Sequence, residues 1–241
     1  MKNPGYTPGF FYCLLSPPGV YPGVDLCDAG TRVNLIPYPK SSLIVLFYLN
    51  SMAVRLQQQC DNGIYFISFT CFRWISLFEI ANTYQSIYKW FDHLNGNNSS
   101  IIGYVIMPNH LHLLAHLPTS LKTVNRTVGN AKRLLAYDII KNLELQKQED
   151  LLQQLYDAVK PNERKKGQRY KVFQESFDAK LCPSIEIVWQ KLNYIHYNPV
   201  RGRWNLAQDF TLYPHSSAGH YYGTKINAYK NIVSVNDVKE V

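Results

Sequence analysis

Cysteine is scarce in this sequence and is not arranged for bridges or metal. The 241 residues contain five cysteines, an odd number, and no two have the Cys-x-x-Cys spacing. Disulfide scaffolds usually carry an even set, and cysteine zinc sites use closely spaced pairs. The pattern argues against a disulfide-rich secreted domain and against a cysteine zinc site, so we expect a cytoplasmic protein.

Long hydrophobic runs are also missing. The apolar run LIVLFYL at residues 43–49 is too short to span a bilayer. It also lies too far from the N-terminus, without a convincing cleavage site, to be a signal peptide. We therefore expect no membrane partner.

Acidic residues are fewer than basic residues. The sequence has 17 Asp and Glu against 25 Lys and Arg, which gives a net charge of +8. Such a balance favours polyanionic partners, nucleic acid above all. Because 46% of the residues are hydrophobic and 14% are aromatic, the chain is expected to be globular.

The first 51 residues lack any amphipathic period. They hold more than half of the 13 prolines, which block regular structure. We interpret residues 1–51 as a poorly ordered extension that the chemistry does not need. Whether it is native stays open, since Met52 begins a more ordinary sequence.

The rest of the chain has the order β-α-β-β-α-β with an added helix. Patterns of hydrophobicity predict a four-stranded antiparallel sheet with helices on one face, an α+β fold. We expect one catalytic domain at residues 52–223 and a C-terminal tail at 224–241. Residues 146–167 are polar and are expected to end in a basic patch. The predicted strands are 64–71, 101–107, 110–117 and 170–177; the predicted helices are 80–94, 121–145 after a cap at 118–120, and 184–198 before Pro199.

Two histidines share the third predicted strand. Side chains alternate faces along a strand, so His110 and His112 point the same way while Leu111 and Leu113 pack on the other face. Two adjacent imidazoles can hold a divalent metal. A pair of half-exposed strand histidines is the alternative interpretation.

The last predicted helix carries a tyrosine and an amide off its apolar stripe. Tyr194 lies far round the helix from Leu192, and Asn198 follows Tyr194 one turn later. Tyr197 is a rival for the same role, and His196, nearer the apolar side, is expected to be structural. A surface tyrosine beside a helix-ending asparagine remains the alternative. The stripe itself consists of Ile185, Val188, Trp189, Leu192 and Ile195.

Together these residues predict a specific chemistry. Two imidazoles and an amide oxygen can hold Mg²⁺ or Mn²⁺ with open positions. The ion can polarise a phosphodiester, and a nearby tyrosine oxygen can attack it to form a phosphotyrosine.

Three segments resemble motifs of one family. They are residues 104–114 (YVIMPNHLHLL), 194–201 (YIHYNPVR) and 213–218 (YPHSSA), the last with Tyr221 and Tyr222. From about residue 52 to 222 the chain is similar to IS200/IS605-type single-tyrosine (HUH) transposases, in the branch associated with repetitive extragenic palindromes. Residues 1–51 have no counterpart there, and Phe173 stands where relatives often have tryptophan.

The resemblance implies fold, roles and products. The fold would be ferredoxin-like, with an added C-terminal catalytic helix. Tyr194 would be the nucleophile, joined to a 5′ phosphate after cleavage of single-stranded or hairpin DNA. His110, His112 and Asn198 would hold the Mg²⁺ or Mn²⁺ ion.

Basic residues before the last strand are candidate phosphate contacts. Tyr170 and Phe173 lie among them, where bases can stack, although core packing is the alternative for Phe173. Lys132 and Arg133 extend the candidates to the long helix. The cluster itself consists of Lys160, Arg164, Lys165, Lys166, Arg169 and Lys171.

Three functions therefore stay open. The first is a metal-dependent DNA transposase, and the second is a domesticated cellular nuclease with the same chemistry. The third is a non-catalytic ferredoxin-like nucleic-acid-binding module, which has no need of a histidine pair facing a tyrosine and would present aromatics on its sheet. A monomer and a homodimer are both compatible with the sequence.

Overall fold

A computed structural model describes residues 62–119 and 123–238. These residues belong to one compact unit, Asn50–Val241. The expectations for residues 1–51 and for a start at Met52 fall outside the described residues. In this part of the chain, no helix combines the length and the apolar character needed to cross a membrane.

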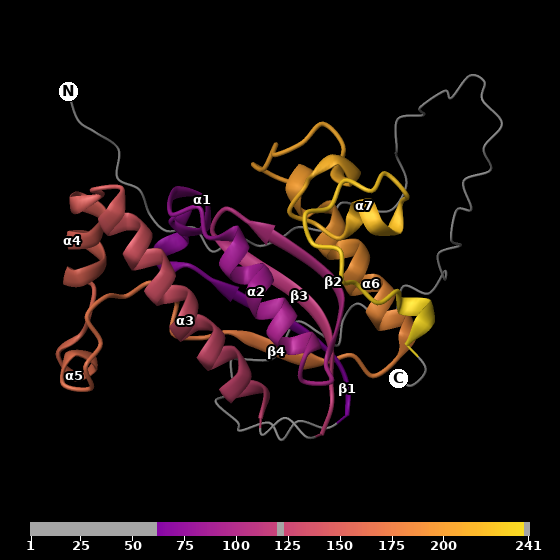
Figure 1. Cartoon of the computed structure of the whole chain (residues 1–241), viewed down its shortest axis with the longest axis horizontal. Coiled ribbons are helices and arrows are strands. Elements are labelled where there is room, and N and C mark those ends of the chain that lie inside the picture. The colour runs from indigo at the N-terminus through magenta and orange to yellow at the C-terminus, as the bar shows by residue number, and fades with distance from the viewer. Residues whose placement is uncertain (1–61, 120–122, 239–241) are drawn as a thin grey trace. The chain divides into compact units, whose positions relative to one another are not determined.

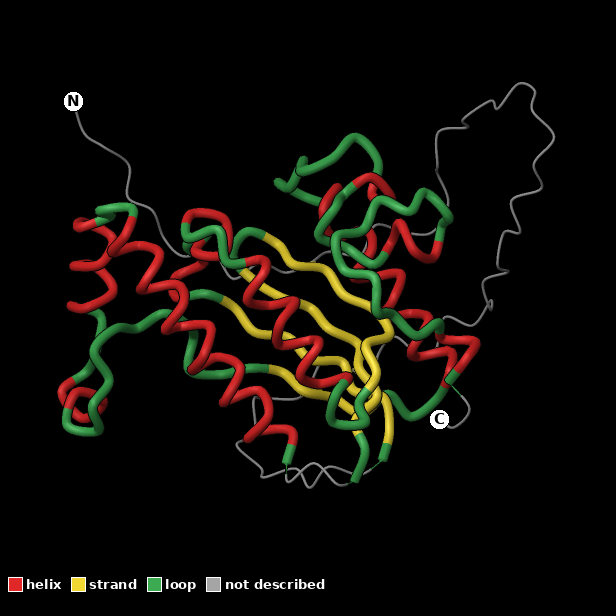
Figure 2. Tube along the Cα trace, viewed as in Figure 1, coloured by secondary structure: helices red, strands yellow, loops and turns green. Residues whose placement is uncertain are grey.

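The centre of the fold is the antiparallel sheet that the sequence predicts. Its strand order is β2-β3-β1-β4, and every neighbouring pair is antiparallel. This is the ferredoxin-like arrangement, with the two central strands β1 and β3 paired along their full length (Figure 2). The strands are β1 (Gly63–Thr70), β2 (Ser100–Met107), β3 (His110–Leu117) and β4 (Asp178–Leu181).

Helices cover both faces of the sheet. The larger core lies under α2 and α3, which cross the front of the sheet in Figure 1, and it takes Ile67 of β1 and Leu113 of β3. The second core lies under α6 and takes Phe66 and Leu114, which are the immediate sequence neighbours of Ile67 and Leu113. This alternation follows from the two-residue period of a strand. The helices are α1 (Leu77–Ile80), α2 (Tyr84–Asn95), α3 (Val124–Leu145), α4 (Glu149–Asp157), α5 (Pro161–Arg164), α6 (Ile185–Tyr197) and α7 (Ala218–Tyr221).

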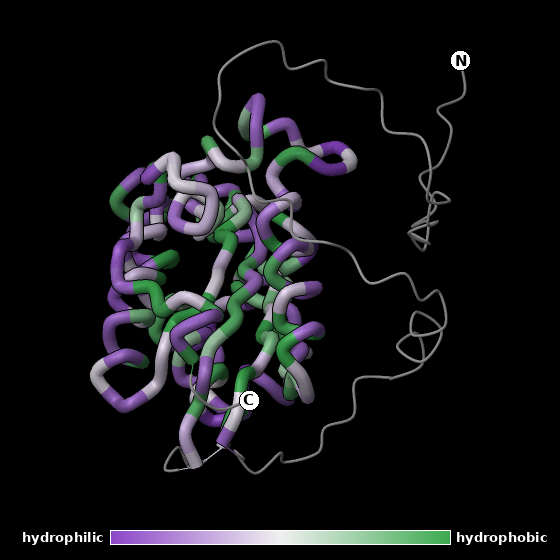
Figure 3. The backbone as a smooth tube through the Cα atoms, turned by 90° about the vertical axis from the view of Figure 1, so that its right-hand side faces the viewer, coloured by the Kyte–Doolittle hydropathy of each residue, from purple (hydrophilic) through white to green (hydrophobic). Residues whose placement is uncertain are grey.

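The distribution of hydropathy agrees with these two cores. Hydrophobic segments run through the strands in the middle of the fold, and hydrophilic segments gather on outer turns and helix faces (Figure 3). Short 3₁₀ turns connect the elements at Phe72–Trp74, Asn198–Val200, Phe210–Leu212 and Val235–Asp237.

The fourth strand was predicted in the wrong place. Residues 170–177 form a loop whose Phe173 makes only a single bridge, to Cys71. Val172 and Phe173 are apolar because they pack into the core from that loop. The true edge strand, DAKL at Asp178–Leu181, is short and polar, since it pairs with β1 alone.

Three other boundaries also differ from the prediction. The helix expected at 80–94 is two helices, separated where Asn82 takes a positive φ of 48°. The long helix begins at Val124, and its cap is Thr123, which accepts a hydrogen bond from the Arg126 amide. The polar stretch at 146–167, where no helix was predicted, contains α4 and α5.

The expected C-terminal tail packs against the domain as far as it is described. Tyr229 is buried in the larger core and Val235 in the second one. The Tyr229 hydroxyl also donates to the carboxylate of Asp92 on α2.

Candidate active site

The histidine pair lies at the start of β3, on the face covered by α6. The ring centroids of His110 and His112 are 4.9 Å apart. Leu111 and Leu113 are buried in the core on the opposite face. The two imidazoles therefore share one side of the sheet, as the strand alternation requires.

A neighbouring amide fixes the tautomer of His110. His110 Nδ1 lies 2.7 Å from Asn109 Oδ1. Because an amide oxygen only accepts, Nδ1 carries the proton and Nε2 keeps its lone pair. Asn109 also donates from Nδ2 to the Trp74 carbonyl at 2.8 Å, within a turn where Arg73 and Trp74 both have positive φ. The sequence suggested only a turn at Asn109; its place directly before the histidines was the available signal.

His112 is buried with an unused nitrogen. Its Nδ1 has no hydrogen-bond partner among the described residues. Its ring stacks on Phe66 of β1 with centroids 5.4 Å apart. Buried polar atoms without partners are uncommon and call for an explanation. An absent metal or substrate atom would provide one.

Burial keeps both histidines neutral near pH 7. It lowers the pKa of His110 to about 4, with a smaller contribution from the charge of Arg203. It lowers the pKa of His112 well below its usual value, with smaller contributions from His110 and Lys191. A neutral imidazole is the form that binds metals. The donor set thus fits a divalent ion.

Helix α6 brings Tyr194 to this pair. The Tyr194 ring centroid is 5.4 Å from that of His112 and 6.2 Å from that of Phe66. The side chain is 43% exposed, so a substrate can reach it.

The other two candidates on this helix have different surroundings. Tyr197 packs on Phe210, with centroids 4.2 Å apart, and its ring lies 5.1 Å from the guanidinium of Arg201. His196 is buried, with Nε2 2.8 Å from Ser217 Oγ. These contacts favour Tyr194 over Tyr197 as the group beside the histidines.

Asn198 ends α6 one turn after Tyr194. Its φ of −53° and ψ of −43° continue the helix, which keeps it on the flank of Tyr194. Its Nδ2 is buried with no partner among the described residues. In the same part of the chain, no three His, Cys, Asp or Glu side chains gather as a metal cluster. The third protein ligand predicted here is an amide oxygen, and its contact with the metal stays a prediction.

Comparison with known proteins finds a solved structure with a similar fold. No protein-family model matches the chain, and no curated protein matches it. Among solved structures it is similar to a REP-associated tyrosine transposase bound to a REP hairpin, with a TM-score of 0.50. The neighbour is a tyrosine transposase. The match has 14% identity and covers 79% of this chain and 99% of that one. The likeness establishes the shared α+β fold.

The basic cluster before β4 lies around α5, away from α6. In Figure 1, α5 is at the lower left, below α4, whereas α6, which carries Tyr194, is on the right. Lys165, Lys166 and Arg169 are exposed there. Arg164 lies 4.0 Å over the Tyr156 ring and donates to the Tyr156 carbonyl. Lys160 pairs with Glu175 at 2.8 Å.

Two of the predicted DNA contacts have partners within the protein. Lys171 is buried and pairs with Glu163 at 2.8 Å and Glu175 at 2.9 Å. These ion pairs occupy the ammonium in the folded protein, and its predicted role as a phosphate contact stays a prediction. Lys132 donates to the Gln174 carbonyl at 2.7 Å, and burial lowers its pKa to about 8.

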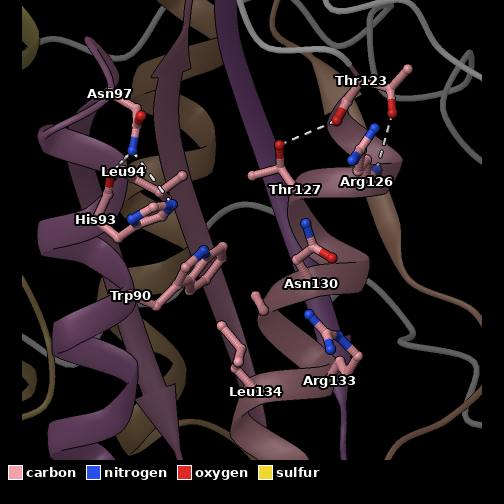
Figure 4. A pocket seen from close by; sticks show the side chains of 11 residues that line it. Trp90, His93, Leu94, Asn97, Thr123, Arg126, Thr127, Asn130, Arg133 and Leu134 are labelled. Carbon is pink, nitrogen blue, oxygen red and sulfur yellow. Dashed lines mark hydrogen bonds between the residues drawn. The ribbon is translucent and has the colours of Figure 1, made fainter.

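Arg133 lies in a pocket between α2 and α3. The pocket has a volume of about 340 Å³ (Figure 4). Arg126, Asn130 and Arg133 follow one another along α3 at helical spacing, facing Trp90 and Leu94 of α2. None of the lining residues is acidic. The pocket is on the face of the sheet that α2 and α3 cover, opposite the face covered by α6, so it is separate from the histidine site.

Proposed function

We propose that this protein is a metal-dependent DNA transposase that cleaves and rejoins single-stranded or hairpin DNA through a 5′-phosphotyrosine intermediate. One observation carries the proposal: the Tyr194 ring lies 5.4 Å from His112, which lies 4.9 Å from His110 on the same face. The fold shared with a tyrosine transposase and the net charge of +8 support it.

The proposed reaction exchanges one phosphodiester bond for another. The Tyr194 oxygen attacks phosphorus, the bond from phosphorus to the 3′ oxygen breaks, and the proton lost by the phenol is balanced by one gained at the 3′ hydroxyl. His110, His112 and Asn198 would hold Mg²⁺ or Mn²⁺. When bound, such an ion supplies Lewis acidity at the phosphate and stabilises the leaving oxygen.

The surroundings of the two histidines suit single-stranded DNA. Trp74 is 54% exposed, and its ring lies 5.7 Å from that of His110. Exposed aromatic rings provide stacking surfaces for unpaired bases. Arg126, Arg133 and the exposed Lys165 and Lys166 that follow α5 offer phosphate contacts elsewhere on the molecule.

The histidine pair favours an enzyme over a binding module. A module that only binds DNA has no need of two buried neutral imidazoles beside a tyrosine. A domesticated nuclease would use the same residues, so the flanking DNA separates it from a mobile element: terminal palindromes around the gene favour mobility.

The test is adduct formation on a labelled DNA hairpin with Mg²⁺ or Mn²⁺, read on a denaturing gel. Wild type and Tyr197→Phe should form the protein–DNA adduct, and Tyr194→Phe should not. Because Tyr194 is 43% exposed and the substitution keeps the ring, the folded state should survive, which circular dichroism checks.

Two results would contradict this assignment. An adduct that persists in Tyr194→Phe and disappears in Tyr197→Phe would move the nucleophile to Tyr197. The absence of any adduct in wild type with every divalent ion tried would favour the binding module.

A further inference from the structure

A lysine that the sequence did not single out shares the flank of α6 with the candidate nucleophile. Lys191 precedes Tyr194 by three residues and Asn198 by seven. At about 100° per residue, these spacings put all three on one side of the helix. Leu192 and Ile195 lie between this side and the opposite flank, where His196 is buried.

Phe66 links this lysine to the site. Lys191 Nζ lies 5.0 Å from the centroid of the Phe66 ring. The same ring stacks on His112 and meets Tyr194 edge-on. An ammonium, an imidazole and a phenol thus converge on one aromatic ring of the central strand.

The Lys191 ammonium has no anionic partner among the described residues. None of the ion pairs in this part of the chain involves it. Asp178 and Lys180 of β4 influence it only at longer range. Burial, followed by the charge of Lys180, lowers its pKa, and its own charge contributes to the low pKa of His112.

A half-buried, unpaired charge destabilises the folded protein unless an anion binds it. The group that must come to Tyr194 in the proposed reaction is an anionic phosphodiester. Charge complementarity therefore identifies the occupant. The Lys191 ammonium lies over the Phe66 ring and the residue is only partly buried, so an anion in solution can reach it.

We propose that Lys191 binds a non-bridging oxygen of the scissile phosphodiester and is a further catalytic residue; this inference rests on the proposed function. Its charge is fixed in place before the reaction, so it stabilises the negative charge that builds up around phosphorus.

The first test compares single-turnover rates of adduct formation. Lys191→Met keeps an unbranched apolar side chain at this position and removes the charge. It should slow the reaction roughly 10- to 100-fold, the size expected for loss of a charge-assisted hydrogen bond. Lys191→Arg should recover part of the rate. Lys141→Gln, on an exposed part of α3, should stay within about twofold of wild type.

The second test measures binding in the Tyr194→Phe background, where no cleavage competes. The oligonucleotide spans the scissile position mapped with wild type, and a matched one carries a neutral methylphosphonate there. Lys191→Met should lower the slope of log Kd against log salt by about 0.7 for the natural oligonucleotide, the value for one contact to a single strand. It should change nothing for the methylphosphonate.

The outcomes separate the two proposals. Wild-type activity in Lys191→Met, or an equal binding defect with both oligonucleotides, would overturn the role of Lys191 and leave the proposed function intact. A wild-type protein that forms no adduct would overturn the proposed function, and the role of Lys191 with it.

Discussion

At the scale of single residues, the candidate site contains polar atoms that are buried without hydrogen-bond partners. His112 Nδ1 and Asn198 Nδ2 are two of the five such side-chain atoms found among the described residues. Each buried unsatisfied group costs about 1–3 kcal/mol of stability. Lys191 adds an unpaired ammonium. The concentration of such groups around Tyr194 is expected where a protein binds a metal or substrate.

A different histidine tests how burial couples stability to pH. His215 stacks on Tyr84, with ring centroids 3.7 Å apart, and its Nδ1 lies 2.8 Å from the Tyr88 hydroxyl. Burial lowers its pKa to about 4. The unfolded chain, with a histidine pKa of about 6.5, therefore binds the proton first as the pH falls. The contribution of neutral His215 to the free energy of unfolding is fully present above about pH 6.5 and is lost as the pH falls towards 4.

The substitution His215→Asn should reduce the loss of stability at low pH. We expect the fall in the free energy of unfolding between pH 7 and pH 4.5 to shrink by about 1–2 kcal/mol, a value reduced for partial exposure. Urea unfolding at several pH values provides the measurement. His93→Asn, at an exposed position on α2, is the control and should leave the fall unchanged. Parallel curves for wild type and His215→Asn would contradict the prediction.

At the scale of elements, the position of α6 on the sheet is fixed by β2. Ser217 Oγ accepts from the Tyr104 amide at 2.9 Å and donates to the Tyr104 carbonyl at 3.2 Å. Its remaining lone pair accepts from His196 Nε2, so the proton of this neutral imidazole is on Nε2. Ser217 therefore connects α6 to β2, and the connection is made at His196, two residues after Tyr194.

The helix comes closest to β2 at a glycine. A Cβ added to Gly103 would lie 2.3 Å from Leu192 Cδ1. Gly103→Ala should therefore push α6 outwards and destabilise the fold by about 1–3 kcal/mol, the usual cost of overpacking. It should also slow adduct formation, because Tyr194 moves with the helix. Denaturant unfolding and the single-turnover rate provide the two readouts.

Gly129 is the matched control. It lies within α3 with nothing inside 4 Å of an added Cβ. Gly129→Ala should stabilise the protein by about 0.5–1 kcal/mol through helix propensity and leave the adduct rate unchanged. If Gly103→Ala behaved like Gly129→Ala, the close approach of α6 to β2 would not determine the position of Tyr194.

At the scale of the whole molecule, positive charge also lies on surfaces outside the candidate site. One basic surface is around α5 and another is the pocket between α2 and α3, with Arg126 and Arg133. Such an arrangement suits a DNA ligand that extends beyond the cleavage point, because phosphate contacts orient a duplex or strand without reading its sequence.

The double substitution Arg126→Gln and Arg133→Gln tests whether the pocket between α2 and α3 contacts DNA. If both residues contact phosphates, the slope of log Kd against log salt should fall by about 1–2 for hairpin binding. Thermal stability should change little, since both side chains are exposed. Fluorescence anisotropy at several salt concentrations measures the slope. An unchanged slope would exclude the pocket from the DNA path.

Lys171→Met provides the contrasting control. It removes a buried ammonium from Glu163 and Glu175, so it should destabilise the fold by about 1–3 kcal/mol. It should not alter the salt slope once the protein is folded. The two variants thus separate a basic residue that binds DNA from one that holds the structure together.

The sequence by itself determined the elements whose hydrophobic period is strong. Strand β3 was predicted at its observed bounds, and alternation alone put His110 and His112 on one face. Helical period likewise separated Tyr194 from the buried stripe of α6. In both cases the information is local, because a residue's face follows from its distance in sequence to its neighbours.

Tertiary structure decided what depends on residues far apart in the chain. Strand β4 was misplaced because an edge strand is specified by its pairing with β1 and not by its own composition. The burial of Lys171 depends on how its loop packs in the folded protein, which a charge count does not include. The role inferred for Lys191 required Phe66, 125 residues earlier, to bring an ammonium, an imidazole and a phenol to one ring.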